Sequence, residues 1–374
     1  MPQFDVVVVG LGAIGSAALH RLARGGARVA GIERYSPGHD RGSSHGETRI
    51  IRLGYFEHPS YVPLLRRAYA LWRELEAEAK AKLLHVTGIA EIGPPDGELV
   101  TGTLSASRLH DLPHEILDAA ETMRRFPAFK LPPDYVGVFQ PDGGFVAVEP
   151  AIKAQLALAE THGAELRIGV TVLSVAPHGG GVRIATSHGD IDAGTAIVAA
   201  GPWVGTLVPN LPVRVTREVM TWFQPSDDAL FTSDRFPVFI LENRHGMHYG
   251  FPLHGSPGVK IAKHHHRDEA VDPDRVDRTV SAADEALVRP VLADHIPAAN
   301  GPLIAAKTCL YTVTPDRDFI IDRLPQAPEI IVASPCSGHG FKFAPVIGEI
   351  LAEMALTGRT GHDIGRFRLG RFGC

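Results

Sequence analysis

Residues 4–33 constrain the fold of this chain more than any other segment. An apolar run over residues 4–9 has the length and composition of a strand buried inside a sheet. The letters GLGAIG follow it, then a stretch with helical spacing, then a second apolar run that ends at Glu33. Strand, glycine turn, helix, strand and acid in this order predict a βαβ unit that binds a dinucleotide.

Each glycine of the turn has a physical task in such a unit. Gly10 makes the tight turn, Gly12 lets the backbone approach a pyrophosphate, and Gly15 lets the helix pack closely on the strand. The helix then presents free N–H groups to the phosphates. Glu33 is placed to accept hydrogen bonds from ribose hydroxyls, which disfavours a 2′-phosphorylated cofactor. The motif predicts FAD or NAD and does not decide between them.

Composition narrows the class of protein. The 374 residues allow two domains, or one large domain with an insertion, and 44% hydrophobic with 21% charged residues is typical of a globular protein. A net charge of −5 gives no electrostatic case for nucleic acid or an anionic membrane. No apolar run could span a bilayer and no signal-peptide pattern occurs, so we expect a cytoplasmic protein. Three cysteines, Cys309, Cys336 and Cys374, exclude a disulfide scaffold.

The remaining pattern indicates a discontinuous layout. Helical spacing predicts helices over residues 61–82, 149–162 and 272–292, and a last helix capped by Gly358. Strands are predicted over residues 166–172, 182–187, 190–193, 196–200 and 329–334. Since 197–200 and 330–333 are the best buried partners for the first strand, the nucleotide domain draws on distant segments. This arrangement suits flavoproteins better than simple NAD dehydrogenases.

We therefore predict a mixed α/β fold in which a Rossmann-like FAD-binding domain carries an inserted, β-rich substrate-binding domain. The predicted FAD-binding domain comprises residues 1–84, 147–212 and 314–374. The predicted substrate-binding domain comprises residues 85–146 and 213–313.

Several longer motifs carry a family resemblance. They are, in chain order, GSSHGETRIIR from residue 42, HYGFP from 248, VKIAKH from 259, CLYT from 309, DFIID from 318 and SGHGFKF from 337. This set closely resembles the monomeric sarcosine oxidase and N-methyltryptophan oxidase family of covalent flavoproteins. The resemblance runs from residue 4 almost to the end of the chain.

The resemblance implies a covalently bound FAD and a carboxylate-bearing substrate. Cys309 stands at the position that joins the 8α-methyl carbon of FAD, whereas Cys336 and Cys374 have no such role. Arg52 and Lys342 match the pair that holds the substrate carboxylate, with Arg as a bidentate donor and Lys as a point charge.

Further roles follow from the resemblance. Arg49 and His45 match residues against the flavin ring, and Lys260 matches the lysine that assists oxygen reduction, where an ammonium lowers the barrier to forming superoxide. Tyr249 and His264 match residues beside the substrate amine. The turn before the last helix could direct positive charge at the flavin edge that becomes negative on reduction.

The remaining assignments of the resemblance complete the site. Tyr311 is assigned to the substrate. The cofactor site is assigned to Gly10, Gly12, Ala13, Ile14, Gly15, Glu33, Ser43, Thr48, Val172, Gly201, Cys309, Gly338, His339, Gly340 and Lys342.

A run of three histidines, His264 to His266, raises the question of a metal site. Neighbouring residues on a strand point to opposite faces, and no acidic or cysteine partner is placed nearby. We therefore predict no metal ion.

The predicted reaction is oxidation of the C–N bond of a secondary, N-methylated or cyclic α-amino acid to an imine, with O₂ reduced to hydrogen peroxide. Sarcosine, N-methyltryptophan and pipecolate remain open as substrates, and the family suggests a monomer. The alternatives are a flavin dehydrogenase with another electron acceptor, a non-catalytic flavin-binding protein and, least favoured, an NAD-dependent dehydrogenase.

Overall fold

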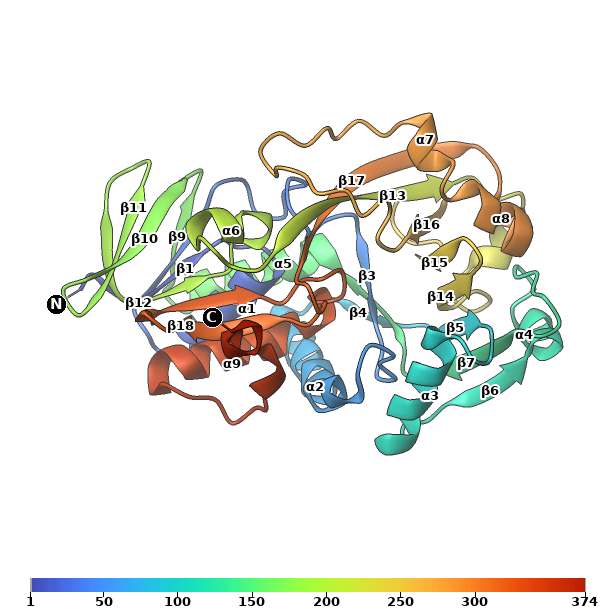
Figure 1. The fold of residues 1–374 in the computed structure, drawn as a ribbon, viewed down its shortest axis with the longest axis horizontal. Helices are drawn as coiled ribbons and strands as arrows, with labels where there is room; N and C mark the ends of the chain where they lie inside the picture. Colours follow the sequence, from blue (N-terminus) through green and yellow to red (C-terminus); the bar gives the residue numbers. More distant parts are fainter. Residues whose placement is uncertain (1, 374) are drawn as a thin grey trace.

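The computed structural model describes residues 2–373 and is built around two eight-stranded sheets (Figure 1). The first sheet contains β1 (Phe4–Val9), β2 (Val29–Glu33), β9 (Glu165–Ile168), β10 (Val172–His178), β11 (Gly181–Thr186), β12 (Ile191–Val198), β18 (Ile320–Leu324) and β19 (Ala327–Ser334). Its parallel centre has the order β19-β12-β1-β2-β9. Both predicted partner strands of the βαβ unit therefore lie in its sheet, but only β12 pairs with β1, and β19 pairs with β12.

Helices cover one face of this sheet. They are α1 (Ala13–Arg24), α2 (Val62–Ala79), α5 (Val148–Thr161) and α9 (Ala344–Thr357). Val6 and Val8 of β1 face this helical core, whereas Val7 and Val9 pack into a second core on the opposite face. The alternation explains why residues 6–9 of this strand are all apolar, since both of its faces are buried there. Gly358 adopts a left-handed φ of 81° directly after α9, as its position predicts.

The second sheet has the order β17-β13-β16-β15-β14-β5-β7-β6. Its strands are β5 (Ile89–Gly93), β6 (Glu115–Asp118), β7 (Val136–Gln140), β13 (Arg214–Phe223), β14 (Val238–Asn243), β15 (Gly246–Gly250), β16 (Val259–Lys263) and β17 (Leu303–Val313). A small third sheet pairs β3 (Thr48–Ile51), β8 (Gly144–Ala147) and β4 (Leu84–Val86).

Shorter helices complete the fold. The α-helices are α3 (Glu98–Leu109), α4 (Ala119–Arg125), α6 (Val204–Leu207), α7 (Ala282–Glu285) and α8 (Arg289–His295). The 3₁₀ helices are η1 (Pro59–Tyr61), η2 (Gly201–Trp203), η3 (Asp228–Phe231), η4 (Pro297–Ala299), η5 (Phe341–Phe343), η6 (Gly365–Phe367) and η7 (Leu369–Phe372).

The strands of each sheet come from separate parts of the chain. The first sheet uses residues 4–33, 165–198 and 320–334, and the second uses residues 89–140 and 214–313. The mixed α/β fold class is confirmed. The domain boundaries at residues 84, 146, 212 and 313 stay a prediction.

Two predicted elements are wrong. The strand over residues 166–172 is divided, because Gly169 has a left-handed φ of 78° between β9 and β10. The helix over residues 272–292 is reduced to α7 and α8 at its C-terminal end. Its first part is an irregular segment with a turn at residues 273–275. It contacts the nucleotide-binding side, where Asp274 accepts hydrogen bonds from Arg34 Nη1 at 2.7 Å and from Trp203 Nε1 at 3.0 Å. These tertiary contacts override the local helical pattern.

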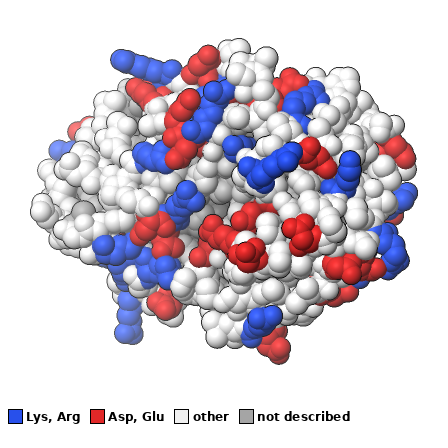
Figure 2. All heavy atoms as spheres, turned by 45° about the vertical axis from the view of Figure 1, so that its right-hand side comes forward, with Lys and Arg blue, Asp and Glu red and all other residues white. Residues whose placement is uncertain are grey.

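The surface in Figure 2 mixes the two signs of charge. On the face shown, Lys and Arg side chains and Asp and Glu side chains both occur in small groups. Among residues 2–373, no helix combines the length and the apolar character needed to cross a membrane.

Candidate active site

Two cavities meet at the start of α1. The nucleotide cavity, with a volume of about 370 Å³, is lined by residues at the ends of β1, β2 and β12. The inner cavity is lined by residues of β3, β14, β15 and β17 and of the turn before α9. Both cavities are lined by Ala13, Ile14, Ser43, Ser44, Pro335 and Cys336. They therefore form one elongated space.

The three glycines of the turn differ in what requires them. Gly10 has a φ of +88°, and a Cβ atom there would lie 2.7 Å from the Ala199 carbonyl oxygen. A Cβ atom at Gly15 would lie 1.7 Å from the carbonyl oxygen of Gly10. At Gly12 the nearest atom to an added Cβ is Ser44 Oγ, at 3.6 Å. The fold thus requires Gly10 and Gly15, whereas Gly12 leaves the nucleotide cavity open for a ligand.

Glu33 lines the nucleotide cavity as a fixed carboxylate. Its Oε2 accepts a hydrogen bond from the Leu11 N–H at 2.8 Å, and its Oε1 accepts one from the Tyr35 N–H at 3.0 Å. Although burial opposes ionisation, His39 and these two N–H groups lower the pKa of Glu33. A charged carboxylate with remaining lone pairs suits ribose hydroxyls. Val172 and Gly201, also predicted for the cofactor, line the same cavity.

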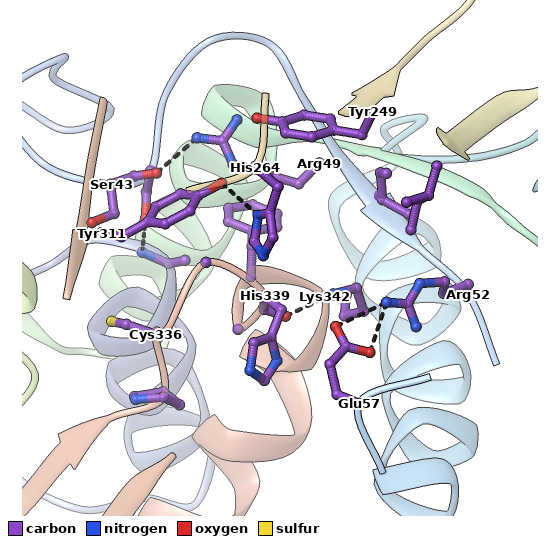
Figure 3. A pocket seen from close by; sticks show the side chains of 18 of the residues that line it. Ser43, Arg49, Arg52, Glu57, Tyr249, His264, Tyr311, Cys336, His339 and Lys342 are labelled. Carbon is purple, nitrogen blue, oxygen red and sulfur yellow. Dashed lines mark hydrogen bonds and ion pairs between the residues drawn. The ribbon is translucent and has the colours of Figure 1, made fainter. Parts of the chain in front are cut away.

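A cationic corner closes one end of the inner cavity (Figure 3). Arg52 Nη2 donates to both carboxylate oxygens of Glu57, at 2.9 and 2.8 Å, and Arg52 Nε lies 3.3 Å from Glu91 Oε1. Glu91 is fully buried, and its Oε2 accepts a hydrogen bond from Gln140 Nε2 at 2.5 Å. Burial raises the pKa of Glu91 to about 7. Arg52 therefore has two carboxylate partners in this structure.

Lys342 is the second cation of this corner. Its Nζ donates to the carbonyl oxygen of His339 at 2.7 Å and lies 5.2 Å from the centre of the Tyr55 ring. Burial and the neighbouring charge of Arg52 lower the pKa of Lys342 to about 7. Its charge therefore changes near neutral pH.

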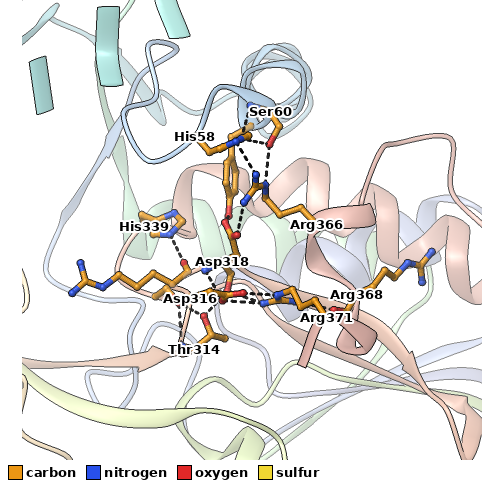
Figure 4. A network of polar contacts seen from close by, with 12 residues as sticks. His58, Ser60, Thr314, Asp316, Asp318, His339, Arg366, Arg368 and Arg371 are labelled. Carbon is orange, nitrogen blue, oxygen red and sulfur yellow. Dashed lines mark hydrogen bonds and ion pairs between the residues drawn. The ribbon is translucent and has the colours of Figure 1, made fainter. Parts of the chain in front are cut away.

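His339 is held by a polar network that reaches the end of the chain (Figure 4). Its Nε2 lies 3.0 Å from the carbonyl oxygen of Arg317, which can only accept, so this nitrogen carries the proton. The Nδ1 then accepts from the Tyr55 hydroxyl at 2.5 Å. Arg366 and Arg371 fix the 316–318 loop by ion pairs of 2.7 Å with Asp318 and Asp316. The network orients His339 as a neutral ring, and burial lowers its pKa to about 4.

Three aromatic side chains line the inner cavity near Arg49. His264 Nδ1 lies 3.4 Å from the hydroxyl of Tyr311, and Tyr249 comes from the adjacent strand β15. Burial raises the pKa of Tyr249 to about 12 and lowers the pKa of His264 far below its usual value. Both side chains are neutral near pH 7. The apolar wall of the cavity is formed by Ile50, Phe56, Ile240, Met247, Phe251, Leu310 and Phe341.

Cys309 lies on β17 behind the cavity wall and next to Arg49. Its Sγ is 3.5 Å from Arg49 Nη2 and 3.5 Å from the carbonyl oxygen of Ser43. Burial raises the pKa of the Cys309 thiol, and the Arg49 guanidinium opposes that shift by stabilising the thiolate. Arg49 also donates to the carbonyl oxygens of Ser43 and Thr48, so its position is fixed.

Lys260 lies one layer behind the cavity. Its Nζ donates to the carbonyl oxygens of Gly46 and Thr48 and lies 3.0 Å from Thr48 Oγ1. The ammonium sits between the rings of Trp222 and Phe251, 5.3 and 4.7 Å from their centres. Burial lowers the pKa of Lys260, whereas three oxygen partners favour its charged form.

The predicted residues thus fall into three positions. Those lining the inner cavity are Ala13, Ile14, Ser43, Arg49, Arg52, Tyr249, His264, Tyr311, Gly338, His339, Gly340 and Lys342. Those lining the nucleotide cavity are Gly10, Gly12, Ala13, Ile14, Glu33, Ser43, Val172 and Gly201. Gly15, His45, Thr48, Lys260 and Cys309 lie behind these walls. His45 is buried, and both its ring nitrogens lack a hydrogen-bond partner.

The three histidines of the run do not lie on a strand, because β16 ends at Lys263. His264 faces Tyr311, whereas His266 Nε2 lies 3.0 Å from Asp284 Oδ1, so an acidic partner that sequence reasoning excluded is present. The two rings nevertheless point to different partners. Cys374 lies outside the described residues.

Sequence reasoning missed the partners of Arg52. Glu57 lies in a loop with no recognisable pattern, but Glu91 gave a signal: it is the one charged residue in the apolar run IAEIG. A charge in a buried strand requires a partner. Ser44 was also missed, although its Oγ lies 3.4 Å from the Ala13 N–H at the start of α1.

Comparison with known proteins agrees with this geometry. A sequence model described as FAD dependent oxidoreductase matches residues 5–354. The monomeric sarcosine oxidase of Streptomyces avermitilis is 41% identical over 373 residues, which cover 98% of this chain and 97% of that protein. The N-methyl-L-tryptophan oxidase of Salmonella typhi is 38% identical over 372 residues, which cover 99% of each chain.

Solved structures show the same architecture. The amino acid oxidase NikD, essential for nikkomycin biosynthesis, has a TM-score of 0.87 at 28% identity, with 98% of both chains covered. The L-proline dehydrogenase of P. horikoshii has a TM-score of 0.86 at 22% identity and covers 100% of this chain and 99% of its own, a likeness of fold. The chain therefore belongs to the FAD-dependent oxidoreductases, in the family of the monomeric sarcosine oxidases and N-methyl-L-tryptophan oxidases.

Proposed function

We propose that this enzyme oxidises the C–N bond of a secondary α-amino acid, N-methylated or cyclic, and passes the electrons to O₂ to give hydrogen peroxide. The observation that carries the proposal is the inner cavity, which joins a cationic corner to an apolar wall and continues into the nucleotide cavity. The relatives named for sarcosine and N-methyl-L-tryptophan point to the same substrate class.

The residues around the two cavities fit FAD. Gly12 leaves space in the nucleotide cavity that a side chain at this position would fill. The buried Ser43 Oγ and both His45 ring nitrogens lack hydrogen-bond partners. In this proposal Glu33 holds the ribose, the start of α1 holds the phosphates, and Cys309 forms the covalent link. When bound, FAD accepts a hydride equivalent from the carbon beside the substrate nitrogen.

The cationic corner binds the substrate carboxylate. Lys342 supplies a point charge, and Arg52 becomes a bidentate donor when the carboxylate takes the place of Glu57 at Nη2. Glu91 is sealed behind Arg52 and keeps its contact during this exchange. The apolar wall then receives the N-substituent or ring of the substrate.

Tyr249, His264 and Tyr311 orient the amine. Because burial keeps the His264 ring neutral, this side chain adds no positive charge beside the substrate amine. The same low-polarity surroundings favour the neutral amine, whose nitrogen lone pair assists loss of hydride from the neighbouring carbon.

A visible spectrum before and after acid precipitation, followed by an amine screen with peroxide detection, tests the proposal. Yellow protein with peroxide production from an N-methyl or cyclic amino acid is the expected result. Substrate-dependent bleaching without peroxide would instead support a dehydrogenase with another acceptor. Yellow protein that no amine bleaches would support a non-catalytic flavin-binding protein.

Carboxylate binding should depend on pH through Lys342. Lys342 is charged below its pKa of about 7, so the affinity for acetate, which has no amine, should be constant below pH 7 and fall as pH rises above it. Lys342→Met should weaken acetate binding at pH 6 by about tenfold or more, since a hydrogen bond to a charged group contributes roughly 1.5–3 kcal/mol. Perturbation of the flavin spectrum reports the binding.

Glu91 complicates this test because its pKa is also about 7. Below that pH its carboxyl group is neutral, and the loss of its negative charge also strengthens acetate binding. Glu91→Gln removes that second group and should retain a pH dependence from Lys342. If Lys342→Met leaves both the affinity at pH 6 and the pH profile unchanged, Lys342 is not part of the carboxylate site.

Gly12→Ala should separate cofactor binding from folding. The added methyl group meets no protein atom closer than 3.6 Å, so the variant should fold with an unchanged circular dichroism spectrum but lose most of its flavin absorbance. Gly15→Ala is the contrasting variant, since its Cβ would clash with the Gly10 carbonyl oxygen and should prevent folding. A yellow Gly12→Ala protein with normal flavin content would contradict the assignment of Gly12 to the phosphate site.

A further inference from the structure

Three side chains meet on the helical face, away from both cavities. His20 belongs to α1, Glu78 to the last turn of α2, and His162 directly follows α5. Glu78 Oε1 lies 2.9 Å from His162 Nε2 and 3.5 Å from His20 Nε2. These three atoms all lie within 4.8 Å of one another. Two imidazole nitrogens and one carboxylate oxygen thus converge from three helices.

His20 lacks the partner that its burial requires. Its ring is 4% exposed, and Nε2 makes no hydrogen bond within the described part of the chain. Burial lowers the pKa of His20, so the ring is neutral and can offer a lone pair. An unsatisfied buried nitrogen costs free energy, and a bound ion is one of the few features that explain it.

The spacing of the donors suits a small divalent ion. Zn²⁺ binds imidazole nitrogen and carboxylate oxygen at about 2.0–2.2 Å in tetrahedral geometry, so neighbouring donors are about 3.3 Å apart. The two distances from Glu78 Oε1, 2.9 and 3.5 Å, lie on either side of that value. We propose that His20, Glu78 and His162 form a site for a divalent transition-metal ion of the zinc type.

Three protein donors leave the fourth coordination position of a tetrahedral ion for a ligand from solvent. The side chains of His162 and Glu78 are 33% and 23% exposed, which provides an entry path and room for a water ligand. Nitrogen donors favour Zn²⁺, Ni²⁺, Co²⁺ or Cu²⁺ over Mg²⁺ and Ca²⁺, which prefer oxygen.

Two nearby cations weaken the affinity of the proposed site for a metal ion. Arg24 Nη1 lies 3.5 Å from Glu78 Oε2, and Arg21 is a second nearby cation. Arg24 contacts the other carboxylate oxygen and is 44% exposed, so solvent screens the repulsion. Among residues 2–373, Glu78 Oε1 contacts only the two proposed imidazole ligands, and a bound ion would replace these contacts. The C-terminal ends of α2 and α5 add partial negative charge at the same place.

A second acidic and histidine cluster provides a contrast. Glu349, Glu353 and His362 lie equally close together, but this cluster has no counterpart to the unpartnered nitrogen of His20. Arg67 donates to both carboxylate oxygens of Glu349, and Thr360 donates to Glu353 Oε2. None of their side-chain atoms is a buried atom without a partner. His362 is therefore a matched control for His162.

Isothermal titration of the chelator-treated holoenzyme with ZnCl₂ tests the proposal. One Zn²⁺ per chain is expected, with no comparable response to MgCl₂. Because His20 is buried and its replacement could disturb folding, the test variants are His162→Ala and Glu78→Gln, which should each weaken Zn²⁺ binding at least tenfold. His362→Ala should bind like the unchanged protein.

A second measurement tests whether Zn²⁺ stabilises the folded protein by joining the three helices. Zn²⁺ should raise the thermal unfolding temperature of the unchanged protein and of His362→Ala but not that of His162→Ala. Absence of Zn²⁺ binding, or equal affinity in His162→Ala and the unchanged protein, would overturn the site. Neither measurement depends on the amine substrate.

Discussion

Cys309→Ser is expected to leave FAD that acid precipitation releases into the supernatant, whereas the unchanged enzyme should give a yellow pellet. The serine hydroxyl cannot supply the thiolate that attacks the 8α carbon, and the Arg49 guanidinium, 3.5 Å from the sulfur, has no anion to stabilise there. The substitution removes little volume from a buried strand, so the protein should still fold. The visible spectra of pellet and supernatant give the result directly.

Cys336→Ser is the matched control for this experiment. Cys336 lines both cavities and its pKa is also raised by burial, to about 11, but no cation lies close to its sulfur in the contacts that the described residues make. This variant should keep a yellow pellet. If Cys309→Ser keeps acid-stable flavin, or if Cys336→Ser loses it, the attachment site must be reassigned.

Lys260→Met is expected to slow reoxidation by O₂ by about 100-fold while the anaerobic reduction by substrate changes little. The first electron transferred to O₂ forms an anion, and the Lys260 ammonium is a fixed positive charge packed between Trp222 and Phe251. Methionine preserves the length and the packing of the side chain but removes its charge. Stopped-flow spectroscopy measures the two half-reactions separately.

Lys263→Met on the same strand is the control, since Lys263 lies at the end of β16 and is half-buried rather than buried. Its reoxidation rate should stay close to that of the unchanged enzyme. Equal slowing of both half-reactions in Lys260→Met would show that Lys260 supports the structure of the site instead of the reaction with O₂.

Local rules were sufficient for the βαβ unit at the start of the chain. The strand, turn and helix of residues 4–24 depend on neighbours in sequence, and the glycine spacing determines both the turn at Gly10 and the contact at Gly15. The buried strands at Ile197 and Ile331 could be placed in the same sheet as β1 because apolar runs of that length need burial on both faces.

The parts that could not be predicted depend on distant contacts. Nothing near Asp274 in the sequence indicates that Arg34 and Trp203 hold it, so the helical pattern of its segment was misleading. The pairing of Arg52 with Glu91 on β5 likewise depends on segments that meet only in the folded chain. The motif identified Arg52, but its electrostatic state could be read only from the structure.

The turn around Asp274 has a consequence for how the enzyme retains its cofactor. Asp274 lines the nucleotide cavity while it bridges Arg34 and Trp203 from two other parts of the chain. This segment lies in sequence between β16 and β17 of the second sheet, so in the proposed binding mode the half of the molecule that lines the inner cavity also contacts the nucleotide end of FAD. Under the proposed linkage, FAD is held at both ends. The covalent bond to Cys309 holds the flavin end, and non-covalent contacts around Asp274 hold the nucleotide end.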